Sequence, residues 1–259
     1  MQRFNVSMKD CLVSNSSQGN ILKWNICNKY IKTSSFNQFN RIWLYESYSE
    51  LVVSKLCKEL GITNFVEYKP CIVVIDNSIE TVGCYSENFC SKSESYVSIA
   101  KMLKMRNIRD TFSLNGYQGY AELISCMQQI TGINIKQYVD TIIELDYITL
   151  NRDRHLGNLG FVYNKETSKI RLAPIFDNGD SLFATSDVSQ FNYDDSLVNY
   201  VKAKPFIFKH DLQLQLVGNR QFTSRKIPNT LRYVDSLQQI GLDKHRVEFI
   251  KQLLKSRTQ

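Results

Sequence analysis

The chain has 259 residues, of which 43% are hydrophobic, with 14 tyrosines, 14 phenylalanines and a formal net charge of +7. This length and apolar content exclude a disordered chain and allow one large domain or two lobes. The positive charge is compatible with a phosphate-bearing partner, but the basic residues are spread out and form no arm typical of nucleic-acid binding.

The cysteines and the N-terminus indicate the cellular compartment. The seven cysteines include no C-x-x-C pair and the chain has only three histidines, so a zinc site is not expected. The opening residues "MQRFNVSMKD" contain no apolar signal segment, and we expect reduced thiols in a cytoplasmic protein. The apolar run "CIVVI" at 71–75 is far too short to cross a bilayer, so no membrane partner is expected.

Short strands around one helix are predicted for the first ninety residues. The segments 21–26 and 29–33, "ILKWNI" and "KYIKT", are predicted to form a hairpin because only two residues separate them. Within 41–61, apolar residues recur at helical spacing and Gly61 is a typical helix stop. Further strands are predicted within 65–76 and 79–86.

Helices are predicted to dominate from about residue 93 onwards. Two helical patterns, 120–132 and 133–150, meet at Gly132. A hairpin is predicted from 159 to 176, and two helices broken at Gly241 are predicted within 231–255. The predicted fold class is therefore α+β, with a small β-rich lobe at 1–90 and a larger, mainly helical lobe at 91–259.

A group of polar residues lies between two of these elements, in "LNRDRHLGN" at 150–158. Asp153 and Asn158 lie in this stretch, and Asp177 follows the hairpin in "PIFDNGD". A carboxylate such as Asp153 can accept the proton of an incoming hydroxyl. Asn158 offers a neutral hard oxygen and Asp177 an anionic one, the ligand types that suit Mg²⁺ beside a nucleotide's phosphates.

The alternative for Asp153 is a surface ion-pair cluster with its two flanking arginines, worth about 0–1 kcal/mol. D-R-H-x-x-N followed by F-D-N-G favours a site instead. The stretch 151–182 resembles the catalytic core of the small HipA-like Ser/Thr kinases, and D-R-H-x-x-N also resembles phosphoinositide kinases, which share the protein-kinase-like fold. The resemblance implies a bilobal kinase-like fold, with Asp153 as catalytic base and Asn158 and Asp177 as metal ligands. His155 is either catalytic or supporting, and we favour the supporting role.

A kinase also needs a cation on the α- and β-phosphates and a helical carboxylate that holds it. Lys32 ends a strand-like run, and Glu50 lies on the following helix, where it matches the glutamate that opens the helix motif of HipA-like kinases. Lys23 and Lys29 are competing candidates for the cation, and Glu46 is one for the carboxylate. The remaining alternative is that Lys32 is an exposed strand lysine and that Glu50 lies on a solvated helix face.

Two segments are candidates for binding the rest of the nucleotide. The segment 13–24, "VSNSSQGNILKW", has a single glycine, but small polar residues can still hold phosphate. In "YSENFCS", the backbone of Glu87 and Phe89 resembles the adenine-binding hinge of HipA-like kinases, although an ordinary loop is the alternative. The resemblance also implies autophosphorylation at Ser16 or Ser17, which would add about −1.5 to −2 charge beside ATP. The candidates for phosphate binding are Ser16, Ser17, Gln18 and Gly19, with a plain polar turn as the alternative.

The leading prediction is an ATP- and Mg²⁺-dependent protein Ser/Thr kinase of the HipA-like class, capable of autophosphorylation. A lipid kinase is a second hypothesis, but no basic amphipathic helix for a membrane surface is present in the pattern. A nucleotide-binding pseudokinase is a third. A protein substrate and a cognate antitoxin or regulatory protein are the expected partners, and no nucleic acid is expected. A toxin, a secreted effector and a housekeeping regulator all fit this core.

Overall fold

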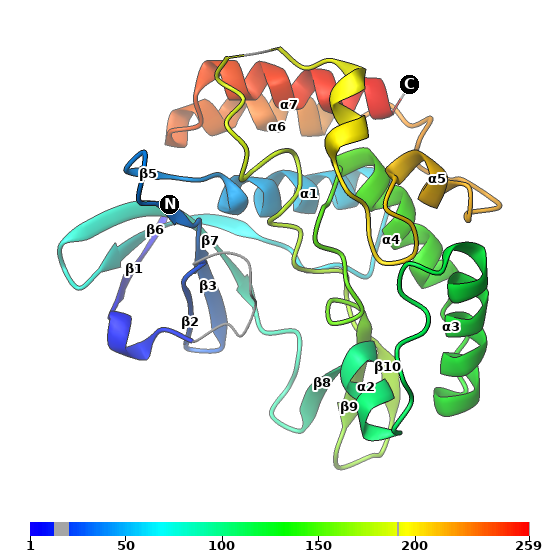
Figure 1. Cartoon of the computed structure of the whole chain (residues 1–259). Coiled ribbons are helices and arrows are strands. Elements are labelled where there is room, and N and C mark those ends of the chain that lie inside the picture. The colour runs from blue at the N-terminus through cyan, green and yellow to red at the C-terminus, as the bar shows by residue number, and fades with distance from the viewer. Residues whose placement is uncertain (13–20, 191, 259) are drawn as a thin grey trace. The chain divides into compact units, whose positions relative to one another are not determined.

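The computed structural model describes residues 1–12, 21–190 and 192–258 (Figure 1). The chain folds into two compact units, and each is made of separate stretches of sequence. The first unit consists of Met1–Phe89, Asn178–Asn192 and Ile227–Lys251. The second consists of Cys90–Asp177, Tyr193–Lys226 and Gln252–Gln259. The first unit thus combines the residues expected in the β-rich lobe with two stretches from much later in the chain.

A five-stranded sheet ordered β1-β6-β7-β3-β2 forms the centre of the first unit (Figure 1). Strands β1 and β6 are parallel, and the other neighbours are antiparallel. The predicted hairpin is confirmed as β2 and β3, where Cys27 and Asn28 have φ values of 49° and 65°, as a two-residue turn between twisted strands requires. The strands of this unit are β1 (Gln2–Val6), β2 (Lys23–Ile26), β3 (Lys29–Thr33), β4 (Phe36–Asn37), β5 (Ile42–Trp43), β6 (Lys69–Ile75) and β7 (Ile79–Glu87), with a short 3₁₀ turn η1 (Met8–Asp10) after β1.

Helix α1 (Glu46–Leu60) is the predicted helix of this unit, and it ends at Gly61 with φ 78°. Most of its side chains are buried, including the carboxylates of Glu46 and Glu50. Helix α6 (Pro228–Ser236) packs against α1. The turn η3 (Leu237–Ile240) follows, and Gly241 with φ 99° separates it from α7 (Lys244–Arg257), as the sequence predicts. A core of alternating strand residues lies on the sheet: Phe4, Val6, Trp24, Ile31, Cys71, Val73 and Ile75.

The second unit combines a small antiparallel sheet with helices. The sheet has the order β10-β9-β8, and β9 with β10 is the predicted hairpin. The long helices α3 and α4 are separated by Gly132 with φ 72°, which confirms the predicted break. The elements are β8 (Glu94–Ser98), α2 (Ile99–Met105), α3 (Gly116–Thr131), α4 (Lys136–Thr149), β9 (Gly160–Asn164), β10 (Ile170–Leu172), η2 (Asp195–Tyr200) and α5 (His210–Leu214).

Helix α4 leads into the loop at 150–158, and its apolar side chains are buried. Val139, Ile142, Ile143 and Ile148 are each no more than 1% exposed, so the apolar side of this helix is fully packed. No disulfide joins any of the seven cysteines, all of which lie in the described ranges. Within the described ranges, no helix combines the length and the apolar character needed to span a membrane.

Candidate active site

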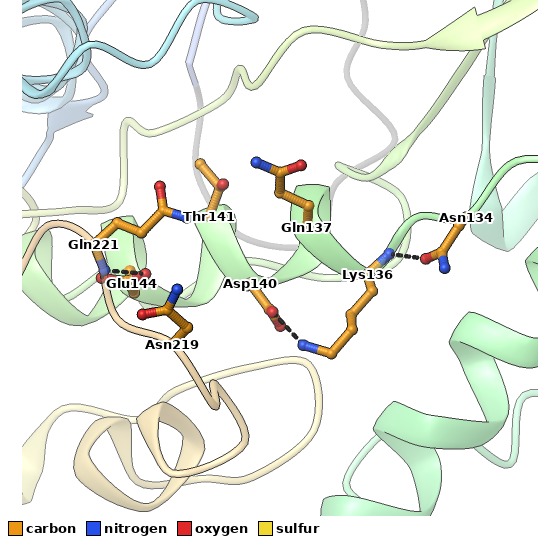
Figure 2. A pocket seen from close by; sticks show the side chains of 8 residues that line it. All are labelled: Asn134, Lys136, Gln137, Asp140, Thr141, Glu144, Asn219 and Gln221. Carbon is orange, nitrogen blue, oxygen red and sulfur yellow. Dashed lines mark hydrogen bonds and ion pairs between the residues drawn. The ribbon is translucent and has the colours of Figure 1, made fainter.

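Helix α4 carries a polar pocket on its N-terminal half and the candidate loop after its C-terminal end. The ion pair of Lys136 with Asp140 lies in the pocket, and both oxygens of Glu144 accept hydrogen bonds from the N–H of Gln221, at 2.8 and 3.0 Å. None of the residues that the sequence predicts for the site lines this pocket, so we do not assign catalysis to it. Figure 2 shows the residues that line its volume of about 380 Å³: Asn134, Lys136, Gln137, Asp140, Thr141, Glu144, Asn219 and Gln221.

The candidate loop begins at Leu150, where α4 ends. Leu150 has φ 53°, in the left-handed region that a bulky residue seldom adopts, and its N–H donates to the carbonyl of Asp146. The N–H of Asn151 donates to the same carbonyl at 3.1 Å. The Oδ1 of Asn151 in turn accepts the N–H of Asp153 at 2.9 Å, which is a local turn typical of asparagine. The end of a packed helix therefore fixes the backbone of Asp153.

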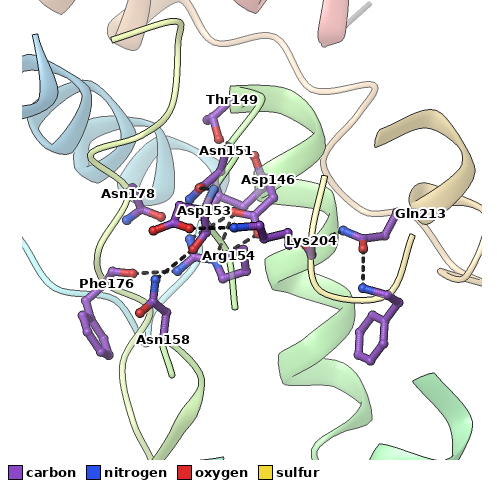
Figure 3. Close-up of polar contacts among 12 residues, drawn as sticks. Asp146, Thr149, Asn151, Asp153, Arg154, Asn158, Phe176, Asn178, Lys204 and Gln213 are labelled. Atoms are coloured by element: carbon purple, nitrogen blue, oxygen red, sulfur yellow. Dashed lines mark hydrogen bonds and ion pairs between the residues drawn. The ribbon is translucent and has the colours of Figure 1, made fainter. Parts of the chain in front are cut away.

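A fully buried ion pair joins the loop to α4. Arg154 donates from Nε to Oδ2 of Asp146 and from Nη2 to Oδ1, both at 3.0 Å, and its Nη1 donates to the carbonyl of Phe176 at 2.7 Å (Figure 3). The side chains of Arg154 and Asp146 are 0% and 1% exposed. Burial alone would lower the pKa of Arg154, but the carboxylate of Asp146 outweighs this effect and holds that pKa above its ordinary value. Arg154 thus ties the loop to the residue before Asp177.

The carboxylate of Asp153 is partly exposed and has a cation on one oxygen. The Nζ of Lys204 donates to Oδ1 at 2.9 Å, while Oδ2 lies 3.8 Å from Nε2 of His155. The backbone carbonyl of Asp153 accepts a hydrogen bond from Nδ2 of Asn158 at 3.2 Å (Figure 3). The structure therefore brings together Asp153, His155 and Asn158, the three residues predicted to be catalytic.

His155 is held by the loop itself. The N–H of Gly157 donates to Nδ1 at 3.0 Å, so Nδ1 acts as an acceptor and we assign the ring proton to Nε2. A Cβ at Gly157 would stand 2.7 Å from Nδ1 and Cε1 of the ring, closer than real contacts allow. Glycine is therefore needed here for the imidazole to dock. This geometry favours the supporting role of His155, whose Nε2 lies 3.8 Å from Oδ2 of Asp153.

Asn158 and Asp177 are the predicted metal ligands, and their donor chemistry fits a hard divalent cation. Because Nδ2 of Asn158 donates to the backbone, the amide is oriented with Oδ1 as its available acceptor. Asp177 has φ 61°, and its negative charge helps to raise the pKa of Arg154. Among the described residues, no group of three or more His, Cys, Asp or Glu could hold a metal by itself. One amide and one carboxylate suit an ion that phosphates also ligate.

Lys32 and Glu50 lie together in the first unit, as a buried ion pair. The Nζ of Lys32 donates to Oε1 of Glu50 at 2.7 Å and lies 5.1 Å from the ring centroid of Tyr68. Oε2 of Glu50 accepts the N–H of Asn178 at 2.9 Å. Both carboxylate oxygens therefore have a partner, as a buried charge requires. Asn178 directly follows Asp177 in the chain.

The competing candidates have other partners. Glu46 is buried, which raises its pKa, and its Oε2 accepts the N–H of Ser35 at 3.2 Å. Lys29 lies 3.6 Å from Glu87, and Lys23 stands opposite Lys32 in the β2–β3 register. Glu87 is the last residue of β7, with Phe89 two residues further on. The predicted phosphate-binding residues fall outside the described ranges: Ser16, Ser17, Gln18 and Gly19.

Two residues of the site were missed by the sequence analysis. Asp146 carries a detectable signal, because it follows Ile142 and Ile143 by four and three residues and so falls on the buried face of a predicted helix. An aspartate at such a position needs a buried partner. Lys204, in "KPF" at 204–206, carries no spacing signal that would connect it with Asp153, since the contact spans 51 residues.

Comparison with known proteins identifies the class of fold. No protein-family model and no curated protein sequence matches the chain. The crystal structure of the proinflammatory kinase CtkA of Helicobacter pylori matches with a TM-score of 0.64 at 15% identity, over 97% of this chain and 94% of that one. The chain therefore has a protein-kinase-like fold, and the predicted α+β kinase-like class is confirmed.

Two further solved structures align less closely. HipA of Shewanella oneidensis, in a complex with HipB and operator DNA, has a TM-score of 0.43 at 12% identity, over 95% of this chain and 61% of HipA. A Golgi casein kinase with Mn and ADP bound has a TM-score of 0.43 at 12% identity, over 96% of this chain and 66% of that one.

Proposed function

We propose that the chain is an ATP- and Mg²⁺-dependent protein Ser/Thr kinase of the HipA-like class. The observation that carries this proposal is the carboxylate of Asp153, fixed by its backbone contacts and a lysine, beside Asn158, whose amide donates from Nδ2 to the backbone and so leaves Oδ1 as an acceptor. The kinase-like fold supports it. A base and hard oxygen ligands on a preorganised loop are what phosphoryl transfer needs, because its catalysis is mostly positioning and charge stabilisation.

In the proposed reaction, the hydroxyl oxygen of a substrate serine or threonine forms a bond to the γ-phosphorus of ATP. The bond from that phosphorus to the β–γ bridging oxygen breaks, ADP leaves with the electron pair, and the hydroxyl proton passes to Asp153. Asn158 and Asp177 hold Mg²⁺, which when bound neutralises charge on the phosphates. Lys32, held by Glu50, supplies a cation for the α- and β-phosphates.

Other parts of the proposal come from the sequence resemblance. The backbone of Glu87 and Phe89 binds adenine, and Ser16, Ser17, Gln18 and Gly19 bind the phosphates. One of these serines is a target of autophosphorylation, through which the kinase regulates itself. The other partners are a protein substrate and a cognate antitoxin or regulatory protein, in the cytoplasm.

Replacing Asp153 by asparagine is expected to lower phosphoryl transfer by about 10²–10⁴-fold, because the amide cannot accept the proton. Purified chain is incubated with γ-labelled ATP and Mg²⁺, with and without a cell lysate, and mass spectrometry locates the incorporated phosphate. D235N is the matched control, because Asp235 also pairs with a lysine, Lys251, at 2.8 Å, and takes no part in the proposed site. It is expected to transfer phosphate like the wild type.

Three results would replace the proposal. Nucleotide binding without label on any protein would indicate a pseudokinase. Label on phosphoinositide vesicles in place of protein would indicate a lipid kinase. Equal rates for D153N and the wild type would remove Asp153 from the mechanism.

A further inference from the structure

The segment Lys204–Pro205–Phe206 places the ammonium group of Lys204 beside Asp153, the candidate base, although the two residues are far apart in the sequence. Lys204 reaches Asp153 across 51 residues, with a 2.9 Å contact from Nζ to Oδ1. That distance is typical of a charge-assisted hydrogen bond. Both residues belong to the second unit.

Buried contacts fix the backbone that carries Lys204. The side chain of Gln213, only 1% exposed, donates to the carbonyl of Lys204 at 2.8 Å and accepts the N–H groups of Phe206 and Ile207 at 2.9 and 3.1 Å. The ring of Phe206 is fully buried and meets the ring of Tyr120 edge-on, with centroids 5.5 Å apart. A lysine on so constrained a backbone has only its own side-chain torsions left to vary. Figure 3 shows Gln213 and Lys204 on one side of Asp153.

The contribution of the Lys204–Asp153 pair to folding stability does not account for the buried contacts that fix the backbone of Lys204. The side chains of Lys204 and Asp153 are 34% and 30% exposed. Ion pairs with such access to water contribute little to folding, whereas the pair of Arg154 with Asp146 is fully buried. The main effect of the Lys204 contact is therefore on the orientation of the carboxylate.

We infer that Lys204 is a positioning residue for Asp153, and that Oδ2 of Asp153 accepts the substrate's hydroxyl proton. This inference rests on the proposed kinase function. The ammonium group of Lys204 donates to Oδ1 of Asp153, so rotation of the carboxylate would break this charged hydrogen bond. Oδ2 lies 3.8 Å from Nε2 of His155, beyond hydrogen-bonding distance, and is the oxygen to which a hydroxyl can donate. The proton moves from the hydroxyl to Oδ2 as the new P–O bond forms and ADP departs.

The test measures kcat, the KM for ATP and the melting temperature of full-length K204M, K204Q and K204R. Loss of the charge in K204M is expected to lower kcat by about 10–100-fold, with the KM for ATP changed by less than about threefold. K204R is expected to recover most of the rate, because a guanidinium also donates to a carboxylate. K202M is the matched control, since Lys202 lies two residues away and is exposed. It is expected to behave like the wild type.

A double variant separates positioning from a general structural effect. D153N/K204M is expected to be no slower than D153N alone, because Lys204 acts through the carboxylate that D153N removes. If K204M does not fold, K204Q decides in the same way. A wild-type kcat in K204M, a change confined to KM, or additive losses in the double variant would overturn the role of Lys204 and leave the kinase proposal standing. A wild type that transfers no phosphate would overturn both.

Discussion

Replacing Arg154 by methionine is expected to lower the free energy of unfolding of the second unit by about 3–5 kcal/mol. The side chain is 0% exposed and makes a bidentate pair with Asp146, which is itself 1% exposed. Methionine leaves that carboxylate buried without its cation, and it removes the 2.7 Å hydrogen bond to the carbonyl of Phe176. The penalty for the stranded charge, more than the lost attraction, makes this effect large.

Hydrogen exchange of the α4 peptides measures this effect best, because both tryptophans, Trp24 and Trp43, belong to the first unit. A loss of 3–5 kcal/mol corresponds to exchange about 10²–10⁴-fold faster for amides that open with the whole unit. R171M is the control: Arg171 pairs with Glu94 in the same unit but is 47% exposed, so hydrogen exchange of the α4 peptides is expected to stay close to that of the wild type.

The double variant R154M/D146L tests the physical reason. Replacing both charges by apolar side chains leaves no buried ion, so much of the lost stability is expected to return. If R154M is as stable as R171M, or if the double variant is less stable than R154M, the pair does not fasten the loop to α4 in the way described.

Local patterns predicted the elements of this fold because local physics determines them. The hairpin of β2 and β3 follows from a two-residue turn between apolar runs, and α1 follows from its apolar spacing and Gly61. The candidate site was predicted from its residue types, because Asp153 and Asn158 in the loop at 150–158 and Asp177 after the hairpin form a recognisable set of a base and two hard oxygen ligands.

Contacts between distant segments could not be predicted in this way. The grouping of Asn178–Asn192 and Ile227–Lys251 with the first unit depends on tertiary packing, for which one sequence carries no period or spacing. The contact of Lys204 with Asp153 is another contact between distant segments, because the sequence does not distinguish Lys204 from the many other lysines as the partner of Asp153. The rival carboxylates on α1 were separated only by their observed partners, Lys32 for Glu50 and Ser35 for Glu46.

Replacing Lys32 by methionine is expected to lower kcat/KM for ATP by about 10²–10³-fold, the usual loss when one preorganised charge contact to a phosphate or oxyanion is removed. Lys32 is the cation that the proposed reaction places on the α- and β-phosphates, and Glu50 holds it at 2.7 Å. E50Q is expected to lower kcat/KM as well, because the neutral amide no longer holds the ammonium group as a charged partner. K29M and E46Q are matched controls, on the same strand and the same helix, and each residue has a partner of its own outside the pair, Glu87 for Lys29 and Ser35 for Glu46.

Stability has to be measured beside the rate, because the pair is buried and either single change leaves one charge without its partner, at a cost of about 3–5 kcal/mol. Trp24 and Trp43 lie in the first unit, so urea unfolding followed by tryptophan fluorescence reports on this unit directly. Rates are compared at a temperature where each variant is fully folded. If the Lys32–Glu50 pair is purely structural, folded K32M turns over ATP as fast as folded K29M. If Lys32 binds phosphate, K32M stays slow even under conditions where it is fully folded, and only that result supports the proposed role of Lys32.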